Sequence, residues 1–243
     1  EHPRIRSANA CLASSSFAID LATRHDSLLH VLHLTTAIEM GLFSSAPLAE
    51  KRITAEVCVH HLWFDESRYD ELGTRIKCNP AIKTAEDRAA LIKAVNEDRI
   101  DIIATDHAPH TIAEKGKSYF KAPAGLPLVQ HVMLCLFDMA HAGQIDYERI
   151  ADKTAHAVAD IYGVEERGYV REGYFADLVL MDPDRPYTVT SANLLAKCHW
   201  SPFEGHTFRS TVDTTIVNGT VVYTDGELTG QIPGQPLVCS RSR

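Results

Sequence analysis

Several features that mark common classes of protein are missing from these 243 residues. No apolar run reaches the roughly 18 residues that a membrane-spanning helix needs, so we expect no membrane partner. No glycine-rich phosphate loop follows a predicted strand, which argues against a doubly wound nucleotide-binding sheet. Basic residues are not in excess, since the formal net charge is −8. A nucleic-acid partner is therefore not expected.

Cysteine is sparse and is not arranged in pairs. None of the six cysteines belongs to a CxxC motif, and most of them lie in apolar runs. We interpret them as reduced, buried thiols. With no signal peptide at the start of the sequence, this predicts a cytoplasmic location. The sequence begins with Glu1 instead of Met, and we expect it to be a piece of something longer.

Predicted strands and helices alternate through the first two thirds of the sequence. This alternation is typical of βα units around a parallel sheet. Because polar residues gather where the predicted strands end, we favour an α/β barrel of the TIM type over an open sheet and place it at residues 1–164. The predicted strands cover residues 27–36, 52–64 and 100–106, and the predicted helices cover residues 7–25, 85–99, 126–143 and 147–163.

The composition changes after residue 164. Short β-prone runs alternate with turn signals, and Asn218-Gly219 between "TTIV" and "TVVY" predicts a tight two-residue hairpin. We therefore predict a small β-rich subdomain over residues 165–243, with the last dozen residues as a loose terminus.

The three predicted strands bring metal-binding side chains to their carboxyl ends. His33 lies near the end of the first, the pair His60 and His61 near the end of the second, and Asp106 at the end of the third. Imidazole and carboxylate groups together suit Zn²⁺, and the sequence has 13 histidines. A turn cap is the alternative for Asp106. Adjacent strand residues point to opposite faces, so we expect a structural role for at least one of His60 and His61 and assign no ligand role to either.

Two loops carry further candidates. Asn79-Pro80 predicts a turn. Residues 121–127, "KAPAGLP", predict a stiff loop whose N–H groups can bind an anion or a carbonyl group. A plain connection remains the alternative for both loops.

These segments together resemble the dihydroorotases, which are members of the metal-dependent amidohydrolase superfamily. The resemblance runs through nearly the whole sequence with its segments in the family's order. The run DHAPH separates dihydroorotases from hydantoinases and allantoinases, whose corresponding runs differ. The segments that carry the resemblance are "HVLHLTT", "AEVCVHHLWF", "KCNPAIK", "ATDHAPH" and "PAGLP", with "GYVREGYFADLVLMD" and "VNGTVVYTDGEL" resembling the superfamily's small β subdomain.

The resemblance implies a zinc-dependent, reversible hydrolysis of dihydroorotate to N-carbamoyl-aspartate in pyrimidine biosynthesis, with one or two zinc ions. It implies that His33 is a zinc ligand and that Asp106 is both a zinc ligand and the general base. It also implies that Asn79 and His110 contact the substrate, while Ala124 and Gly125 offer it backbone groups.

One departure limits what the resemblance implies. Family members open the barrel with a His-x-His pair followed by an arginine, and this sequence contains no His-x-His. It therefore resembles the C-terminal part of a dihydroorotase barrel with the small subdomain attached. Two alternatives stay open: a dihydropyrimidinase or hydantoinase, and a non-catalytic scaffold subunit. A small-molecule substrate and a homo-oligomer are the partners that the resemblance implies.

Overall fold

The computed structural model describes residues 1–240, which form two compact units. The first unit comprises Glu1–Val132 and Leu194–Glu204, and the second comprises Met133–Asn193 and the described residues from Gly205 onward. This division does not coincide with the boundary at residue 164, which stays a prediction. Residues 241–243 of the predicted β-rich part lie outside the described residues.

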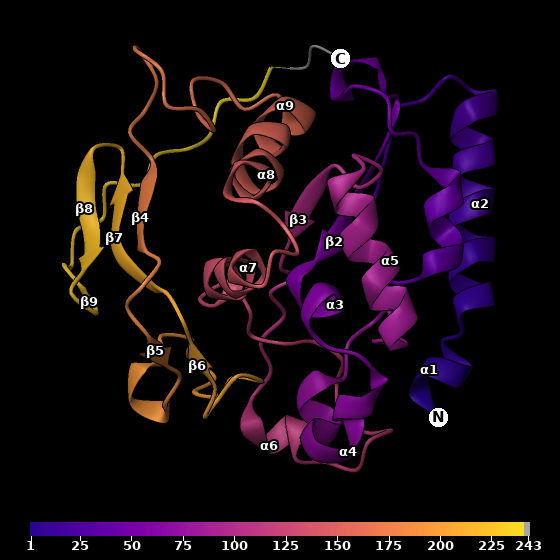
Figure 1. Ribbon diagram of the computed structural model, residues 1–243, viewed down its shortest axis with the longest axis horizontal. Helices are drawn as coiled ribbons and strands as arrows, with labels where there is room; N and C mark the ends of the chain where they lie inside the picture. The colour runs from indigo at the N-terminus through magenta and orange to yellow at the C-terminus, as the bar shows by residue number, and fades with distance from the viewer. Residues whose placement is uncertain (241–243) are drawn as a thin grey trace. The chain divides into compact units, whose positions relative to one another are not determined.

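The first unit contains a three-stranded parallel sheet, of which Figure 1 labels β2 and β3. Its order is β1 (Leu29–Val31), β2 (Ile53–Cys58) and β3 (Ile102–Ala104), with β2 paired to both neighbours. Every residue of β2 except Ile53 is buried. The strands point the same way, so their carboxyl ends meet at one edge of the sheet, as the βα alternation predicts.

Two helices of the first unit begin directly after capping residues. Ser7 accepts a hydrogen bond from the amide of Ala10 and opens α2 (Ala8–Arg24). Thr84 and Asp87 form a capping box that opens α5 (Ala85–Asn96). The predictions for residues 7–25 and 85–99 are confirmed within a few residues.

The predicted strand over residues 52–64 is wrong in its second half. β2 ends at Cys58, and Val59–Trp63 form a short helix, α3. The apolar run "VCVHHLWF" does not distinguish a buried strand from a buried helical turn, because both are apolar on all sides. The consequence is large: His60 and His61 lie on one helical turn and are both buried, instead of pointing to opposite faces of a sheet.

The other boundaries also shift. β1 and β3 are shorter than the predicted strands at 27–36 and 100–106. The predicted helix over 126–143 begins only at Val132, as α7 (Val132–His141). Before it, Leu126 forms a β-bridge and residues 129–131 form a turn, and the amides of Leu128 and Val129 donate to the Nδ1 atom of His107, at 3.0 and 3.1 Å.

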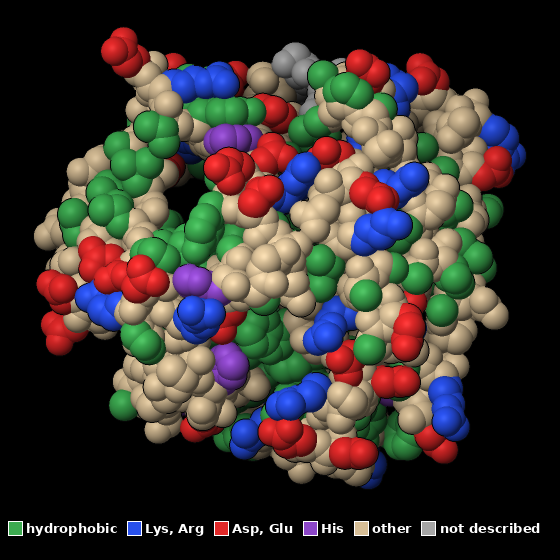
Figure 2. Space-filling view, in the orientation of Figure 1, with side chains coloured by type: hydrophobic (Ala, Val, Ile, Leu, Met, Phe, Trp, Pro, Cys, Tyr) green, Lys and Arg blue, Asp and Glu red, His purple; other side chains and the backbone are tan. Residues whose placement is uncertain are grey.

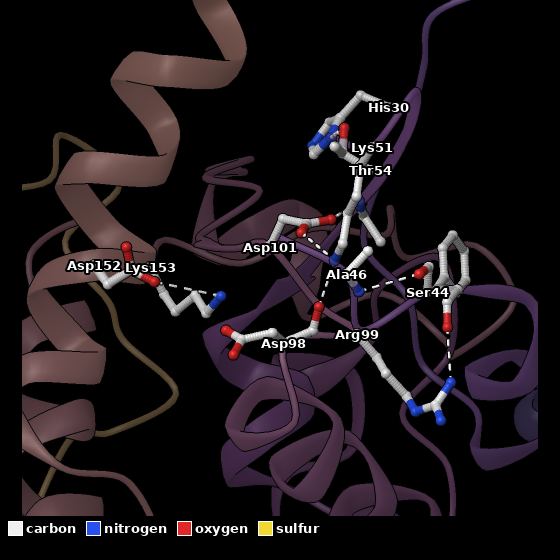
Figure 3. A network of polar contacts seen from close by, with 12 residues as sticks. His30, Ser44, Ala46, Lys51, Thr54, Asp98, Arg99, Asp101, Asp152 and Lys153 are labelled. Carbon is white, nitrogen blue, oxygen red and sulfur yellow. Dashed lines mark hydrogen bonds and ion pairs between the residues drawn. The ribbon is translucent and has the colours of Figure 1, made fainter. Parts of the chain in front are cut away.

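A buried ion pair lies at the amino ends of β2 and β3 (Figure 3). The ammonium of Lys51 is 2.7 Å from the carboxylate of Asp101 and also donates to the carbonyl of Asp98. The second oxygen of Asp101 accepts from the amide of Ala55 at 2.8 Å. Both side chains of the pair are almost fully buried. This ion pair therefore joins the start of β2 to the start of β3, away from the edge that carries His33 and Asp106.

The second unit is helical first and then antiparallel. A helical stretch consists of α8 (Tyr147–Ala151), a π-helical segment (Asp152–His156) and α9 (Ala157–Tyr162). Gly163 ends it in the left-handed conformation. The four-stranded sheet has the order β4-β7-β8-β9. Asn218 and Gly219, with φ of 48° and 76°, form the predicted hairpin turn between β7 and β8.

The remaining elements are short. The strands of the second unit are β4 (Leu178–Asp182), β5 (Tyr187–Thr188), β6 (Thr207–Phe208), β7 (Thr211–Val217), β8 (Thr220–Thr224) and β9 (Glu227–Leu228). The short helices are α1 (His2–Ile5), α4 (Tyr69–Leu72) and α6 (Ile112–Lys115), with 3₁₀ segments at Ala37–Leu42, Leu48–Glu50, Glu66–Arg68, Gly73–Ile76 and Ser191–Asn193.

The helices and the surface bear on the expectations from composition. No helix within residues 1–240 is long and apolar enough to cross a membrane. On the face drawn in Figure 2, acidic and basic side chains are interspersed.

All six cysteines are free thiols, as predicted, but Cys11 and Cys198 are only half-buried and Cys239 is exposed. The expectation that all six are buried is therefore wrong.

Candidate metal and substrate site

The site begins at the carboxyl edge of the parallel sheet. His33 follows β1 with φ of 43°, and Asp106 follows β3 with φ of 44°. Positive φ is uncommon outside glycine, although His and Asp adopt it more readily than most residues. Both predicted metal ligands thus have a constrained backbone that turns the chain as soon as the strand ends. An outlier of this kind is a reason to suspect function.

β2 lies between β1 and β3, and the helix α3 that directly follows β2 carries two histidines. His60 and His61 are 1% and 2% exposed, and the centroids of their rings are 4.1 Å apart. Among residues 1–240, neither ring nitrogen of His60 has a hydrogen-bond partner, and the Nδ1 atom of His61 has none. The Nε2 atom of His61 donates to the carbonyl of Pro80 at 3.0 Å. Buried polar atoms without partners are rare in folded proteins. A bound ligand such as a metal ion would provide these nitrogen atoms with a partner.

His33 belongs to the same cluster. Its Nδ1 atom is also buried, with no hydrogen-bond partner in the part of the chain that the structure describes. Burial, followed by the nearby His61 and His33, holds the pKa of His60 well below its usual value. Burial also lowers the pKa of His61 to about 3, against the opposing effect of the Pro80 carbonyl and with help from His33 and Lys83. We call His33, His60 and His61 the histidine cluster.

The electrostatics of the cluster suit metal binding. At neutral pH, His60 and His61 are uncharged, and a neutral imidazole is the form that coordinates a metal. The hydrogen bond from His61 to Pro80 fixes which nitrogen of that ring carries the proton and leaves Nδ1 with a free lone pair. A backbone carbonyl that accepts the other ring N–H commonly orients a metal-binding histidine.

A thiol and a carboxylate lie next to the cluster. Ligand atoms of Cys58, His60 and His61 lie within 4.8 Å of one another, which makes these three a group that could hold a metal ion. The pKa of the Cys58 thiol is raised by burial first, and then by Glu56 and Asp106. Asp106 is therefore close enough to act on Cys58 electrostatically. The raised pKa makes Cys58 the weakest donor of the group, since only a thiolate is a good ligand.

The structure thus extends the predicted ligand set. His33 and Asp106 are not members of the three-residue group, but each acts electrostatically on one or more of its members. Sequence reasoning did not assign a ligand role to His60 or His61. The available signal was a pair of adjacent histidines inside an apolar run that directly follows a buried strand. Three imidazoles with unpartnered nitrogen atoms and one nearby carboxylate form a donor set that fits Zn²⁺.

The loop that was predicted to contact substrate packs against the DHAPH turn. The amide of Gly125 donates to the carbonyl of Lys77 at 2.9 Å. Gly125 has φ of 139°, and a Cβ atom at this position would be 2.5 Å from the carbonyl oxygen of Ala108. Only glycine therefore allows this close approach. The Nε2 atom of His110 donates to the carbonyl of Ala124 at 3.0 Å.

The structure brings three of the four predicted substrate residues into direct contact or adjacency: His110, Ala124 and Gly125. Asn79 is exposed and accepts a hydrogen bond at Oδ1 from His2 at 3.2 Å. It also lines a pocket of about 540 Å³, together with His33 and Pro80. A volume of this size suits a small molecule. His107 was not a predicted site residue, and its role is to accept the amides of Leu128 and Val129 and so anchor the loop.

A model described as "Amidohydrolase family" matches residues 6–222. The chain belongs to the amidohydrolase family. As an amidohydrolase it is similar to proteins named dihydroorotase. It is 36% identical over 230 residues to that of Halobacterium salinarum, covering 95% of this chain and 53% of the relative. It is 34% identical over 206 residues to that of Clostridium acetobutylicum, covering 84% and 48%. The resemblance to dihydroorotases is confirmed, and this chain spans about half the length of the curated relatives it matches.

Solved structures share the fold of this amidohydrolase. A D-hydantoinase matches with a TM-score of 0.87 at 20% identity, covering 95% of this chain and 52% of that one. The L-hydantoinase from Arthrobacter aurescens matches with a TM-score of 0.83 at 23% identity, covering 88% and 49%. The α/β class predicted from the sequence is confirmed.

Proposed function

We propose that the protein containing this chain is a dihydroorotase and that the chain forms the C-terminal part of its TIM-type (β/α)₈ barrel together with the small β-rich subdomain. The observation that carries the proposal is the histidine cluster beside Asp106 at the carboxyl edge of the sheet, the edge where such barrels build their active sites. The dihydroorotase relatives support this substrate over others.

The metal that we propose for this site is Zn²⁺, as one or two ions. His33, His60 and Asp106 would hold it, with His61 as a further donor. When bound, zinc polarises a carbonyl group and lowers the pKa of water towards about 7. The unpartnered nitrogen atoms of the cluster are the observation that supports the assignment.

The chemistry left to the side chains is a proton transfer. In the proposed reaction, water adds to the carbonyl carbon of the cyclic amide, the C–N bond breaks, and the leaving nitrogen gains a proton to give N-carbamoyl-aspartate. Asp106 takes the proton from the water and delivers it to the nitrogen. Asp106 is exposed and none of residues 1–240 donates a side-chain hydrogen bond to it, so both carboxylate oxygens can accept.

Substrate would be bound by the residues around the loop. We propose that the side-chain amide of Asn79 and the Nδ1 atom of His110 contact it, since the Nε2 atom of His110 already binds Ala124. The backbone of Ala124 and Gly125 completes the set. A cytoplasmic location and a homo-oligomer remain predictions of the same proposal.

The full-length protein should hydrolyse dihydroorotate and form it from N-carbamoyl-aspartate. The competing assignment is a hydantoinase or dihydropyrimidinase, which the solved structures resemble in fold. Purified protein is assayed against dihydroorotate and dihydrouracil at equal concentration. Preference for dihydrouracil contradicts the proposal. Absence of both activities together with absence of bound zinc favours the scaffold alternative.

Replacing His60 by alanine should greatly lower the zinc content of the protein. His60 offers two unpartnered nitrogen atoms, and loss of one ligand from a zinc site removes a large part of its binding energy. Zinc is measured by atomic absorption after dialysis, with His25→Ala as the matched control because His25 is exposed at the end of α2. Equal zinc content in the two variants would show that His60 is not a ligand.

A further inference from the structure

Two buried lysines bind the loop at residues 121–127, which we call the substrate loop. Lys115 ends the short helix α6 and is 1% exposed, while Lys77 is 9% exposed and precedes Cys78 and Asn79. Within residues 1–240 neither ammonium forms an ion pair with a carboxylate. A buried charge without a counter-ion is costly unless hydrogen bonds satisfy it. Both ammonium groups are satisfied by backbone carbonyls alone.

The hydrogen bonds of Lys115 converge on one loop. Its Nζ atom donates to the carbonyls of Pro123 and Gly125, each at 3.0 Å, and to that of Lys77 at 3.3 Å. These three bonds use all the donors of an ammonium group. The ring of Trp200 lies 5.6 Å from the same atom, close enough for a cation–π contact. Burial lowers the pKa of Lys115 to about 8, so the group is still charged at pH 7.

Lys77 extends the same arrangement. Its Nζ atom donates to the carbonyls of Tyr119 and Ala122, at 2.6 and 2.7 Å. Its own carbonyl accepts the amide of Gly125. Lys77, which lies two residues before Asn79, therefore binds the loop through both its ammonium group and its backbone carbonyl.

One backbone amide of the loop takes no part in these hydrogen bonds. The carbonyls of Ala122, Pro123 and Gly125 accept from the two lysines, and the carbonyl of Ala124 accepts from His110. The amides of Ala122 and Gly125 donate to Ser118 and Lys77, and proline has no amide hydrogen. The amide of Ala124 alone has no acceptor among the residues that the structure describes. It lies between the two carbonyls that Lys115 binds.

We propose that Lys115 is a positioning residue: by fixing the carbonyls of Pro123 and Gly125, it holds the amide of Ala124 as a free donor for a carbonyl or carboxylate oxygen of the substrate. The inference rests on the proposed function and names a residue that does not itself touch substrate. An ammonium suits this role because it binds several carbonyls at once in a fixed geometry. A neutral side chain of similar length would leave the carbonyls of Pro123 and Gly125 without a donor, while that of Lys77 would keep the amide of Gly125.

The test uses the full-length, zinc-loaded protein with Lys115→Met. KM for dihydroorotate should rise about tenfold or more, the effect of one displaced hydrogen bond, while kcat changes less than about threefold and zinc content is unchanged. Hydrogen exchange in the peptide covering residues 118–127 should become faster. Lys115→Arg, which keeps the charge and the donors, should recover part of the KM. Lys117→Met is the matched control because Lys117 is exposed two residues further on, and it should behave as the unmodified protein.

Three outcomes overturn the proposal. An unchanged KM means that the loop is not positioned for substrate, even if its exchange becomes faster. A parallel loss of kcat, zinc and stability means that Lys115 is only structural. Equal effects of Lys115→Met and Lys117→Met mean that the buried ammonium has no special role. If the unmodified protein does not turn over dihydroorotate, the proposed function fails instead, and the loop exchange alone decides whether Lys115 orders residues 122–125.

Discussion

Asp106→Asn is expected to lower kcat of the full-length protein by about 10²–10⁴-fold, the usual contribution of a general acid–base group. An asparagine keeps the shape of the side chain and tolerates the positive φ of 44° at this position. It cannot accept a proton at neutral pH, so the transfer from water to the leaving nitrogen loses its carrier. Steady-state hydrolysis of dihydroorotate gives kcat, and circular dichroism checks that the fold is retained.

Asp225→Asn is the matched control for this variant. Asp225 is also an exposed aspartate with positive φ, at 52°, but it lies in the turn between β8 and β9. Its replacement should leave kcat within about twofold of the unmodified protein, as expected for a surface change away from the chemistry. If Asp106→Asn retains activity close to that of Asp225→Asn, the assignment of Asp106 as the base is wrong.

Asp101→Asn should destabilise the first unit by about 3–5 kcal/mol, the range observed when one partner of a buried ion pair is removed. Lys51 would keep its charge at the amino end of β2 but lose the carboxylate 2.7 Å away. The hydrogen bond from the amide of Ala55 would also weaken. The free energy of unfolding is measured by urea denaturation of the zinc-loaded protein.

Glu71→Gln provides the comparison for an exposed ion pair. Glu71 lies 2.9 Å from Arg68, and both side chains are about half exposed or more. Such a pair contributes at most about 1 kcal/mol because water and salt screen it. A loss for Asp101→Asn no larger than that for Glu71→Gln would mean that the buried pair does not hold β2 and β3 together.

Local chemistry was enough to predict much of this fold. The Asn218-Gly219 turn acts within four residues, so the hairpin could be predicted without tertiary information. The N-cap at Ser7 and the capping box at Thr84 are equally local. The βα alternation likewise predicted the parallel sheet. The segment before α7 was not predictable in the same way, because its amide at Leu128 bonds to His107, a residue distant in sequence.

The sequence by itself determined the βα order and the polar turn "DIIATDHAPH", including the positions of His33 and Asp106 at strand ends. Only the tertiary structure decided that His60 and His61 share a buried helical turn, because an apolar run has no period that separates strand from helix. Only the tertiary structure decided that Lys115 is buried, since a lysine is ordinarily a surface residue and its carbonyl partners are brought to it by the folded loop. Burial changes the chemistry of an imidazole or an ammonium, and burial is a property of the packed chain.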